Sequence, residues 1–417
     1  MSDVARPGGR HSPHVKPKLS RNKIAAGAAL ILIAGFLTLF IGGGARFAVG
    51  LTLKPIVDDL GWGRSELGLA VALYQVVSAA AMFAAGYLVD RSGPRLVLTL
   101  GLLVSGIGIG LMSVMSSPWH ALLFYGVIFA LGSGAASLIP VSVMVTRAFP
   151  QRTGIANAVV ISGMSAGQLV MIAGLAALLL TVDWRSIYVL LGIAHLALVP
   201  LLLFAIPKTT SAQSKAARPS DGMGIAEAAR TRQFWLLLAI YAICGLDDFF
   251  VATHVVAFAQ DRGVDAFLAG NLLAMMGLTG LVGVMVAGAF SDRSGPVWPT
   301  ALTFVARVAV FGLVMVDQST LSVSIFALVF GATLMVTAPL TAIFVSQNFG
   351  TRHLGALTGL ITMVHHVFGG FGAYLGAAVF DNTGTYDIAF GIMFASSLIA
   401  VVLCAMLRKP ALRAASV

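Results

Sequence analysis

Twelve long apolar runs divide this chain, and they restrict its fold more than any other feature. Each run is roughly 20 residues or longer, the length that an α-helix needs to cross a bilayer. Charged residues make up only 10% of the chain, whereas soluble domains are about a quarter charged. Because a backbone in lipid must satisfy its own hydrogen bonds, the runs are predicted to be transmembrane helices. They cover residues 24–53, 66–88, 96–115, 119–146, 153–181, 185–206, 233–260, 266–290, 297–316, 320–346, 354–380 and 386–407.

Polar segments between these runs predict the domain organisation. Residues 1–23 are expected to form a disordered tail, 24–206 a first six-helix bundle, 207–232 a linker, 233–407 a second six-helix bundle and 408–417 a short tail. The first run is longer than the roughly 7–15 apolar residues of a signal peptide, so we expect it to remain as a helix. The chain is therefore predicted to be an all-α membrane protein.

The lysines and arginines indicate the orientation of the spans. With the N-terminus inside, 20 of the 26 fall in cytoplasmic segments, and only Lys54, Arg64, Arg185 and Arg262 fall on the other side. Cytoplasmic loops of membrane proteins carry this excess generally. The net charge of +10 thus indicates topology with both termini in the cytoplasm, and we expect no nucleic-acid partner.

One sequence pattern occurs twice, about half the chain apart. Gly86-Tyr-Leu-Val-Asp-Arg-Ser-Gly-Pro-Arg95 returns 202 residues later as Gly288-Ala-Phe-Ser-Asp-Arg-Ser-Gly-Pro296, without the last arginine. The two halves are therefore predicted to be parallel repeats related by an axis along the membrane normal. Bundles related in this way leave a cavity between them at mid-membrane, and a cavity that opens to either side in turn belongs to a transporter.

The repeated pattern, G-x-x-x-D-R-x-G-x-R, resembles the loop between helices two and three of the major facilitator superfamily. Two further segments, Gly50 to Arg64 and Phe380 to Asp387, are similar to those of bacterial monocarboxylate porters and oxalate/formate antiporters. The resemblance implies two pseudo-symmetric six-helix bundles in a bacterial inner membrane, and we expect a monomer. In those relatives a basic residue of helix eight helps to bind the carboxylate. Residues 267–290 contain no Lys, Arg or His, so that role has no counterpart here.

The same resemblance implies a gate near the repeated loops. In the superfamily, the aspartate of the pattern faces the start of helix eleven when the site is open to the outside. By this resemblance Asp90 would meet the turn near Leu354, and Asp292 the turn near Thr153. The expected gating residues are Asp90, Arg91, Arg95, Arg152, Asp292, Arg293 and Arg352.

Arg46 is the strongest candidate for binding a substrate. An ionisable side chain at bilayer depth costs several kcal/mol unless it is paired or hydrated, and the 202-residue offset maps Arg46 onto Asp248. We therefore expect Arg46 to bind an anionic group of the substrate. Asp247 or Asp248 would hold the guanidinium when the site is empty. The alternative is a structural ion pair between spans one and seven.

Histidines are the candidates for proton transfer. Asp247 and His254 are seven residues apart and share one face of span seven, so His254 is expected to line the cavity and to carry a proton together with Asp247 and Asp248. The alternative is a buried histidine bonded to a backbone carbonyl.

His365 and His366 lie in the middle of span eleven. One of them is expected to bind substrate or a proton, and the alternative is a hydrogen bond between helices. A metal site that combines His254 with either of them is not expected, because no carboxylate or cysteine joins them at ligand spacing.

The remaining polar residues within spans have two interpretations. Arg307 is expected to be structurally paired or to face a water-filled crevice, because the resemblance places span nine at the periphery. Each of the others could bond to substrate or to a neighbouring helix. They are Tyr74, Gln75, Asn157 and Gln168.

These observations predict a secondary transporter of a small organic anion, with a carboxylate favoured, that is proton-coupled or anion-exchanging and works by alternating access. The alternative is proton-driven efflux of lipophilic or cationic compounds, with Asp247 and Asp248 binding the cation. The sequence contains no HExxH motif or phosphate loop, and neither enzyme activity nor a cofactor is expected. The expected partners are the organic anion, protons and the lipid bilayer.

Overall fold

The computed structural model describes residues 21–149, 153–206, 222–350 and 352–407. These residues form α-helices joined by short turns, with one 3₁₀ turn (η1) and one π-helix (η2). The N-terminal half contains α1 (Arg21–Ala45), α2 (Ala48–Leu60), α3 (Arg64–Ser92), α4 (Pro94–Leu111), η1 (Met112–Val114), α5 (Pro118–Ala121), η2 (Leu122–Phe129), α6 (Ala130–Ala135), α7 (Leu138–Ala148), α8 (Thr153–Leu178) and α9 (Trp184–Ala205). The C-terminal half contains α10 (Ile225–Ala228), α11 (Arg232–Asp261), α12 (Ala266–Ser294), α13 (Val297–Val316), α14 (Thr320–Leu334), α15 (Thr337–Phe349), α16 (Leu354–Thr383) and α17 (Asp387–Met406).

Twelve helical spans in this part of the chain are long and apolar enough to cross a membrane, which confirms the predicted all-α membrane fold. Four spans consist of more than one helical segment, namely α1 with α2, α4 with η1, α5 to α7 with η2, and α14 with α15. The predicted linker contributes the short helix α10. Residues 1–20, 207–221 and 408–417 of the predicted tails and linker lie outside the described residues.

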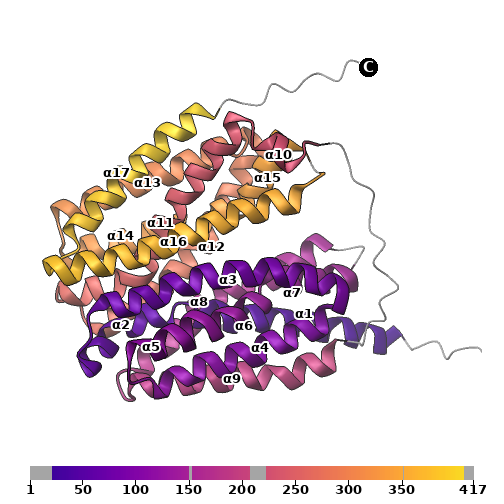
Figure 1. The fold of residues 1–417 in the computed structure, drawn as a ribbon, viewed down its shortest axis with the longest axis horizontal. Coiled ribbons are helices and arrows are strands. Elements are labelled where there is room, and N and C mark those ends of the chain that lie inside the picture. The colour runs from indigo at the N-terminus through magenta and orange to yellow at the C-terminus, as the bar shows by residue number, and fades with distance from the viewer. Residues whose placement is uncertain (1–20, 150–152, 207–221, 351, 408–417) are drawn as a thin grey trace, which may run out of the picture.

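Figure 1 shows the two halves as layers, one coloured indigo to magenta and the other orange to yellow. The helix pairs within each half repeat. α1 packs on α8 as α11 packs on α16, and α4 packs on α9 as α13 packs on α17. Between the halves, α3 packs along α16, α8 along α12 and α2 against α11. The sequence repeat is therefore also a repeat of packing.

Glycines bring the paired helices unusually close together. A Cβ atom at Gly167 of α8 would lie 1.8 Å from the carbonyl oxygen of Phe40 in α1, and one at Gly245 of α11 would lie 1.8 Å from that of His365 in α16. Only glycine, which has no Cβ atom, fits at these two positions. Close backbone contacts at small residues are typical of helix packing in membranes. The two contacts join corresponding pairs of helices, α1 with α8 and α11 with α16.

The halves are joined at one end by a group of side chains that we call the clasp, made of Lys54, Arg64, Asp261, Asp381 and Tyr386. Asp261 of α11 lies 2.7 Å from Arg64 and 3.1 Å from Lys54 of the other half. The Nη1 of Arg64 donates to the Tyr386 hydroxyl at 2.6 Å.

Asp381 closes the clasp by capping a helix of the other half. Its carboxylate accepts hydrogen bonds from the backbone N–H groups of Arg64 and Ser65, at 2.9 and 2.7 Å, at the start of α3. The corresponding helix α12 is capped by Asp265 of its own half. Gly63 occupies the position of Asp265 under the 202-residue offset, so α3 depends on a cap from the second half.

Candidate functional site

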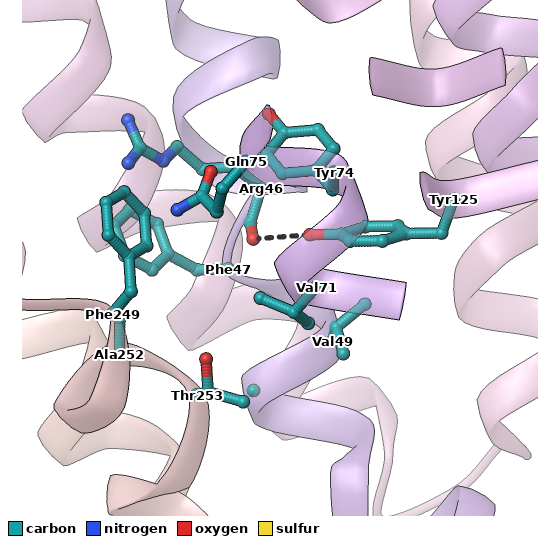
Figure 2. Close-up of a pocket in the computed structure, with 11 residues that line it drawn as sticks. Arg46, Phe47, Val49, Val71, Tyr74, Gln75, Tyr125, Phe249, Ala252 and Thr253 are labelled. Carbon is teal, nitrogen blue, oxygen red and sulfur yellow. Dashed lines mark hydrogen bonds between the residues drawn. The ribbon is translucent and has the colours of Figure 1, made fainter. Parts of the chain in front are cut away.

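A small cavity lies between the halves, beside the break that separates α1 from α2. Its volume is about 20 Å³, which is enough for roughly one water molecule. Side chains from the break, α2, α3, η2 and α11 line it (Figure 2). They are Arg46, Phe47, Val49, Gly50, Val71, Tyr74, Gln75, Tyr125, Phe249, Ala252 and Thr253.

Arg46 lies in the break itself, which turns its side chain toward the second half. Non-helical backbone at membrane depth is tolerated where protein buries it. The guanidinium carbon lies 5.1 Å from the centre of the Phe47 ring and 5.4 Å from that of Phe249, within the range of cation–π attraction. In the described part of the chain no carboxylate lies within ion-pair distance of it. Arg46 is thus a half-buried cation without a counter-charge.

Gln75 of α3 lines the same cavity and has no hydrogen-bond partner. Its side chain is 1% exposed, and neither Nε2 nor Oε1 is bonded to any described residue. Figure 2 shows its amide in the same part of the view as the Arg46 guanidinium. A buried amide without partners costs free energy, so the cavity offers unmet hydrogen-bonding capacity as well as positive charge.

Two tyrosines support this arrangement. Tyr125 lies in the π-helix η2, and its hydroxyl donates to the backbone oxygen of Arg46 at 3.1 Å, which holds the break in place. Tyr74 stacks on Tyr125, with ring centres 4.9 Å apart, and its hydroxyl is bonded to Ser133 at 2.8 Å. The hydroxyls of both tyrosines are therefore already in use.

The predicted pairing of Arg46 with Asp247 or Asp248 is wrong. Asp248 accepts a hydrogen bond from Arg307 Nη2 at 2.5 Å, and Asp247 accepts hydrogen bonds from Ser396 and Ser397. Successive residues on a helix point about 100° apart, and α11 directs Phe249, not the two aspartates, toward Arg46. The structural pairing expected for Arg307 is confirmed.

His365 lies against this buried cluster. Its Nε2 is 3.0 Å from Asp248 Oδ2, a contact between α16 and α11. His366 instead bonds through Nδ1 to the backbone oxygen of Thr362 at 2.9 Å. Of these two histidines, only His365 lies within hydrogen-bond distance of a charged side chain of another helix.

Three possible metal ligands meet at the same point. Ligand atoms of Cys244, Asp248 and His365 lie within 4.8 Å of one another. This group includes neither His254 nor His366, and the sequence does not predict it. Arg307 already neutralises Asp248, and a divalent cation would have to displace its guanidinium. The donor set therefore fits a metal ion poorly.

His254 does not line the cavity, so its predicted position is wrong. It is 1% exposed, its Nε2 donates to the backbone oxygen of Ala373 at 2.8 Å, and its Nδ1 accepts from the Tyr386 hydroxyl at 3.1 Å. Burial raises the pKa of Tyr386, which keeps the hydroxyl protonated as the donor. This arrangement is the alternative considered above, a buried histidine bonded to a backbone carbonyl.

Asn157 and Gln168 make contacts between helices. Gln168 Nε2 donates to the backbone oxygen of Leu273 at 3.1 Å, from α8 to α12, and Asn157 Nδ2 donates to Thr146 at 3.1 Å. Neither residue lines the cavity at Arg46. Their predicted contact with substrate has no support from these positions.

Those predicted gating residues that the structure describes lie at the end of α3, the start of α4, the end of α12 and just before α16, opposite the clasp. Their part in gating stays a prediction, because Arg152 and the side chain of Asp90 lie outside the described part of the chain. Arg95 is half-buried there. The exposed members are Arg91, Asp292, Arg293 and Arg352.

Comparison with known proteins identifies the family. The model of the Major Facilitator Superfamily matches residues 35–247 and 237–416. The chain is 26% identical to monocarboxylate transporter 13 of Rattus norvegicus over 72% of this chain and 70% of that protein. It is 24% identical to the oxalate:formate antiporter of Oxalobacter formigenes over 89% of each chain. The crystal structure of nucleoside transporter NupG shares the fold, with a TM-score of 0.75 at 12% identity over 91% of this chain and 98% of that one. The protein is therefore a member of the Major Facilitator Superfamily, a multi-pass membrane transporter and not an enzyme.

Proposed function

We propose that this protein is a secondary transporter of a small organic anion, with a carboxylate as the group recognised. The observation that carries the proposal is Arg46, a half-buried guanidinium without a counter-charge in a cavity between the two halves. The relatives named as a monocarboxylate transporter and an oxalate:formate antiporter support the same substrate class.

Arg46 is suited to bind a carboxylate. A guanidinium donates two parallel hydrogen bonds to a carboxylate, and such charge-assisted bonds are roughly twice as strong as neutral ones. The rings of Phe47 and Phe249 flank the guanidinium and reduce its contact with water. Substrate binding would supply the negative charge that Arg46 lacks in this structure.

Access to the site requires the halves to move. A cavity of about 20 Å³ is too small for an organic anion, and the clasp joins the halves at one end. We propose that substrate enters when the halves part, and that the site opens to the two sides in turn. The charge distribution supports cytoplasmic termini and an outward-facing clasp, and the similarity to the Oxalobacter formigenes antiporter supports a bacterial inner membrane as the location.

Coupling to protons is proposed to involve the cluster of Asp248 and His365. Asp248 is adjacent to Phe249 on α11, and Phe249 contacts Arg46. A change in the protonation of Asp248 or His365 would therefore act one residue away from a side chain that touches the substrate-binding guanidinium. The other titratable or charged groups near the cluster are Asp247, Cys244, His366 and Arg307. An anion exchanger would need no proton at this position.

Efflux of cations has less support. The alternative requires Asp247 and Asp248 to bind the cation, but Arg307 lies within ion-pair distance of both carboxylates. A cationic substrate would compete with a buried guanidinium that cannot leave the protein.

The test is uptake of labelled mono- and dicarboxylates into proteoliposomes. Arg46→Gln removes the charge at similar length and should lower uptake of the transported acid at least tenfold, the effect of about one charge-assisted hydrogen bond. Arg46→Lys keeps the charge without the paired donors and should be intermediate. The matched control is Arg185→Gln, a surface arginine paired with Asp59, which should transport normally. Normal uptake by Arg46→Gln would disprove the proposal.

A further inference from the structure

We propose that Gln75 recognises a hydroxyl group next to the substrate carboxylate, so that the site selects short 2-hydroxy monocarboxylates. This inference rests on the proposed function, because it assigns the carboxylate to Arg46. It adds a specificity-determining residue and a narrower class of substrate.

The first argument is the hydrogen-bonding capacity of the cavity. Arg46 offers only donors, and the hydroxyls of Tyr74 and Tyr125 are bonded to Ser133 and to the backbone of Arg46. Gln75 has a free donor and a free acceptor in a side chain that is 1% exposed. The hydroxyl of Thr253, which also lines the cavity, can serve either as donor or as acceptor. A ligand that satisfies both Arg46 and Gln75 must therefore accept hydrogen bonds from Arg46 and both donate to and accept from Gln75.

The second argument is the chemistry of the candidate acids. A carboxylate or a ketone only accepts hydrogen bonds, so an unsubstituted or 2-oxo acid leaves Oε1 of Gln75 unpaired. A hydroxyl group both donates and accepts. A 2-hydroxy acid can therefore pair its carboxylate with Arg46 and its hydroxyl with Gln75.

The third argument concerns the size and the apolar part of the substrate. Phe47, Val71 and Phe249 belong to the apolar part of the wall, with Val49 and Ala252, and the cavity holds little free volume before the halves separate. These side chains suit a methyl group or another short alkyl group. A second carboxylate would have no cation there, because Arg46 is the sole lysine or arginine among the described residues that line the cavity.

The experiment measures binding of four probes, propionate, pyruvate, L-lactate and D-lactate, to the purified full-length protein by calorimetry. The wild-type protein should bind at least one lactate enantiomer about 10- to 100-fold more tightly than propionate or pyruvate, because those two acids leave a buried polar group unpaired. Gln75→Met keeps the length of the side chain and removes its donor and its acceptor. This variant should bind lactate no more tightly than propionate, because no side chain then distinguishes the hydroxyl of lactate from the methylene of propionate.

The outcomes separate this inference from the proposed function. Propionate binding by Gln75→Met shows that the variant is folded and that Arg46 still works. Equal binding of all four acids by the wild-type protein, or tightest binding of pyruvate, would overturn the role of Gln75 and leave the proposed function standing. Binding of none of the four acids would also overturn the inference, and the uptake of other mono- and dicarboxylates with the Arg46→Gln variant would then decide the proposed function separately. An unchanged lactate preference in Gln75→Met would also overturn the inference.

Discussion

Replacing Asp381 by alanine should loosen the contact between the two halves at the clasp end. Asp381 accepts hydrogen bonds from two backbone N–H groups at the start of α3, across the interface between the halves. Removing a capping side chain costs about 1 kcal/mol. This cost falls only on the state in which the halves touch at the clasp, so the equilibrium should shift by about fivefold toward the separated state.

The assay is a distance measurement between spin labels by electron paramagnetic resonance. Leu180→Cys and Leu321→Cys place one label on each half near the clasp, at positions that are 60% and 70% exposed. The native cysteines, Cys244 and Cys404, are buried and should not react. The Asp381→Ala variant should show a larger population at the longer distance.

Asp265→Ala is the matched control, because Asp265 caps α12 with bonds to Phe267 and Leu268 of the same half. It should lower thermal stability and leave the distance populations as in wild type. The reasoning is refuted if Asp381→Ala has the wild-type distribution, or if Asp265→Ala shifts the distances equally.

Two further predictions concern packing and coupling. Gly167→Ala should destabilise the protein by about 1–3 kcal/mol or prevent folding, because the added methyl meets α1. Gly174→Ala in the same helix meets no atom within 4 Å and should be neutral or slightly stabilising, as measured by thermal unfolding in detergent. Proton-coupled uptake by the wild-type protein should increase as the external pH falls. His365→Gln keeps a donor for Asp248 but cannot ionise, so uptake by this variant should not increase. A wild-type pH profile for the variant would exclude His365 from coupling.

The sequence predicts the fold well because the fold depends on local patterns. Span length and apolar content place twelve helices, and the repeated pattern predicts two related halves that the packing of α1 on α8 and α11 on α16 confirms. The sequence also identifies Arg46 as a candidate, because an ionisable side chain at bilayer depth is energetically costly and is therefore usually functional.

The sequence predicts the partners of these residues poorly because partners depend on side-chain direction. The 202-residue offset relates Arg46 to Asp248 in sequence, but one step along α11 changes the direction by about 100°, and Phe249 takes the place next to Arg46. Nothing local indicates that Asp381 caps a helix more than 300 residues away. Gln75 appears in the sequence as one of several polar residues, and only the missing bonds in the structure distinguish it.

The most direct test of the account is an experimental structure of the protein with the tightest-binding carboxylate of the panel. The account predicts that the carboxylate lies between the two halves within hydrogen-bond distance of the Arg46 guanidinium, with Gln75 bonded to the adjacent substituent. A carboxylate bound elsewhere, with the Arg46 side chain unoccupied or turned away from it, would contradict the account.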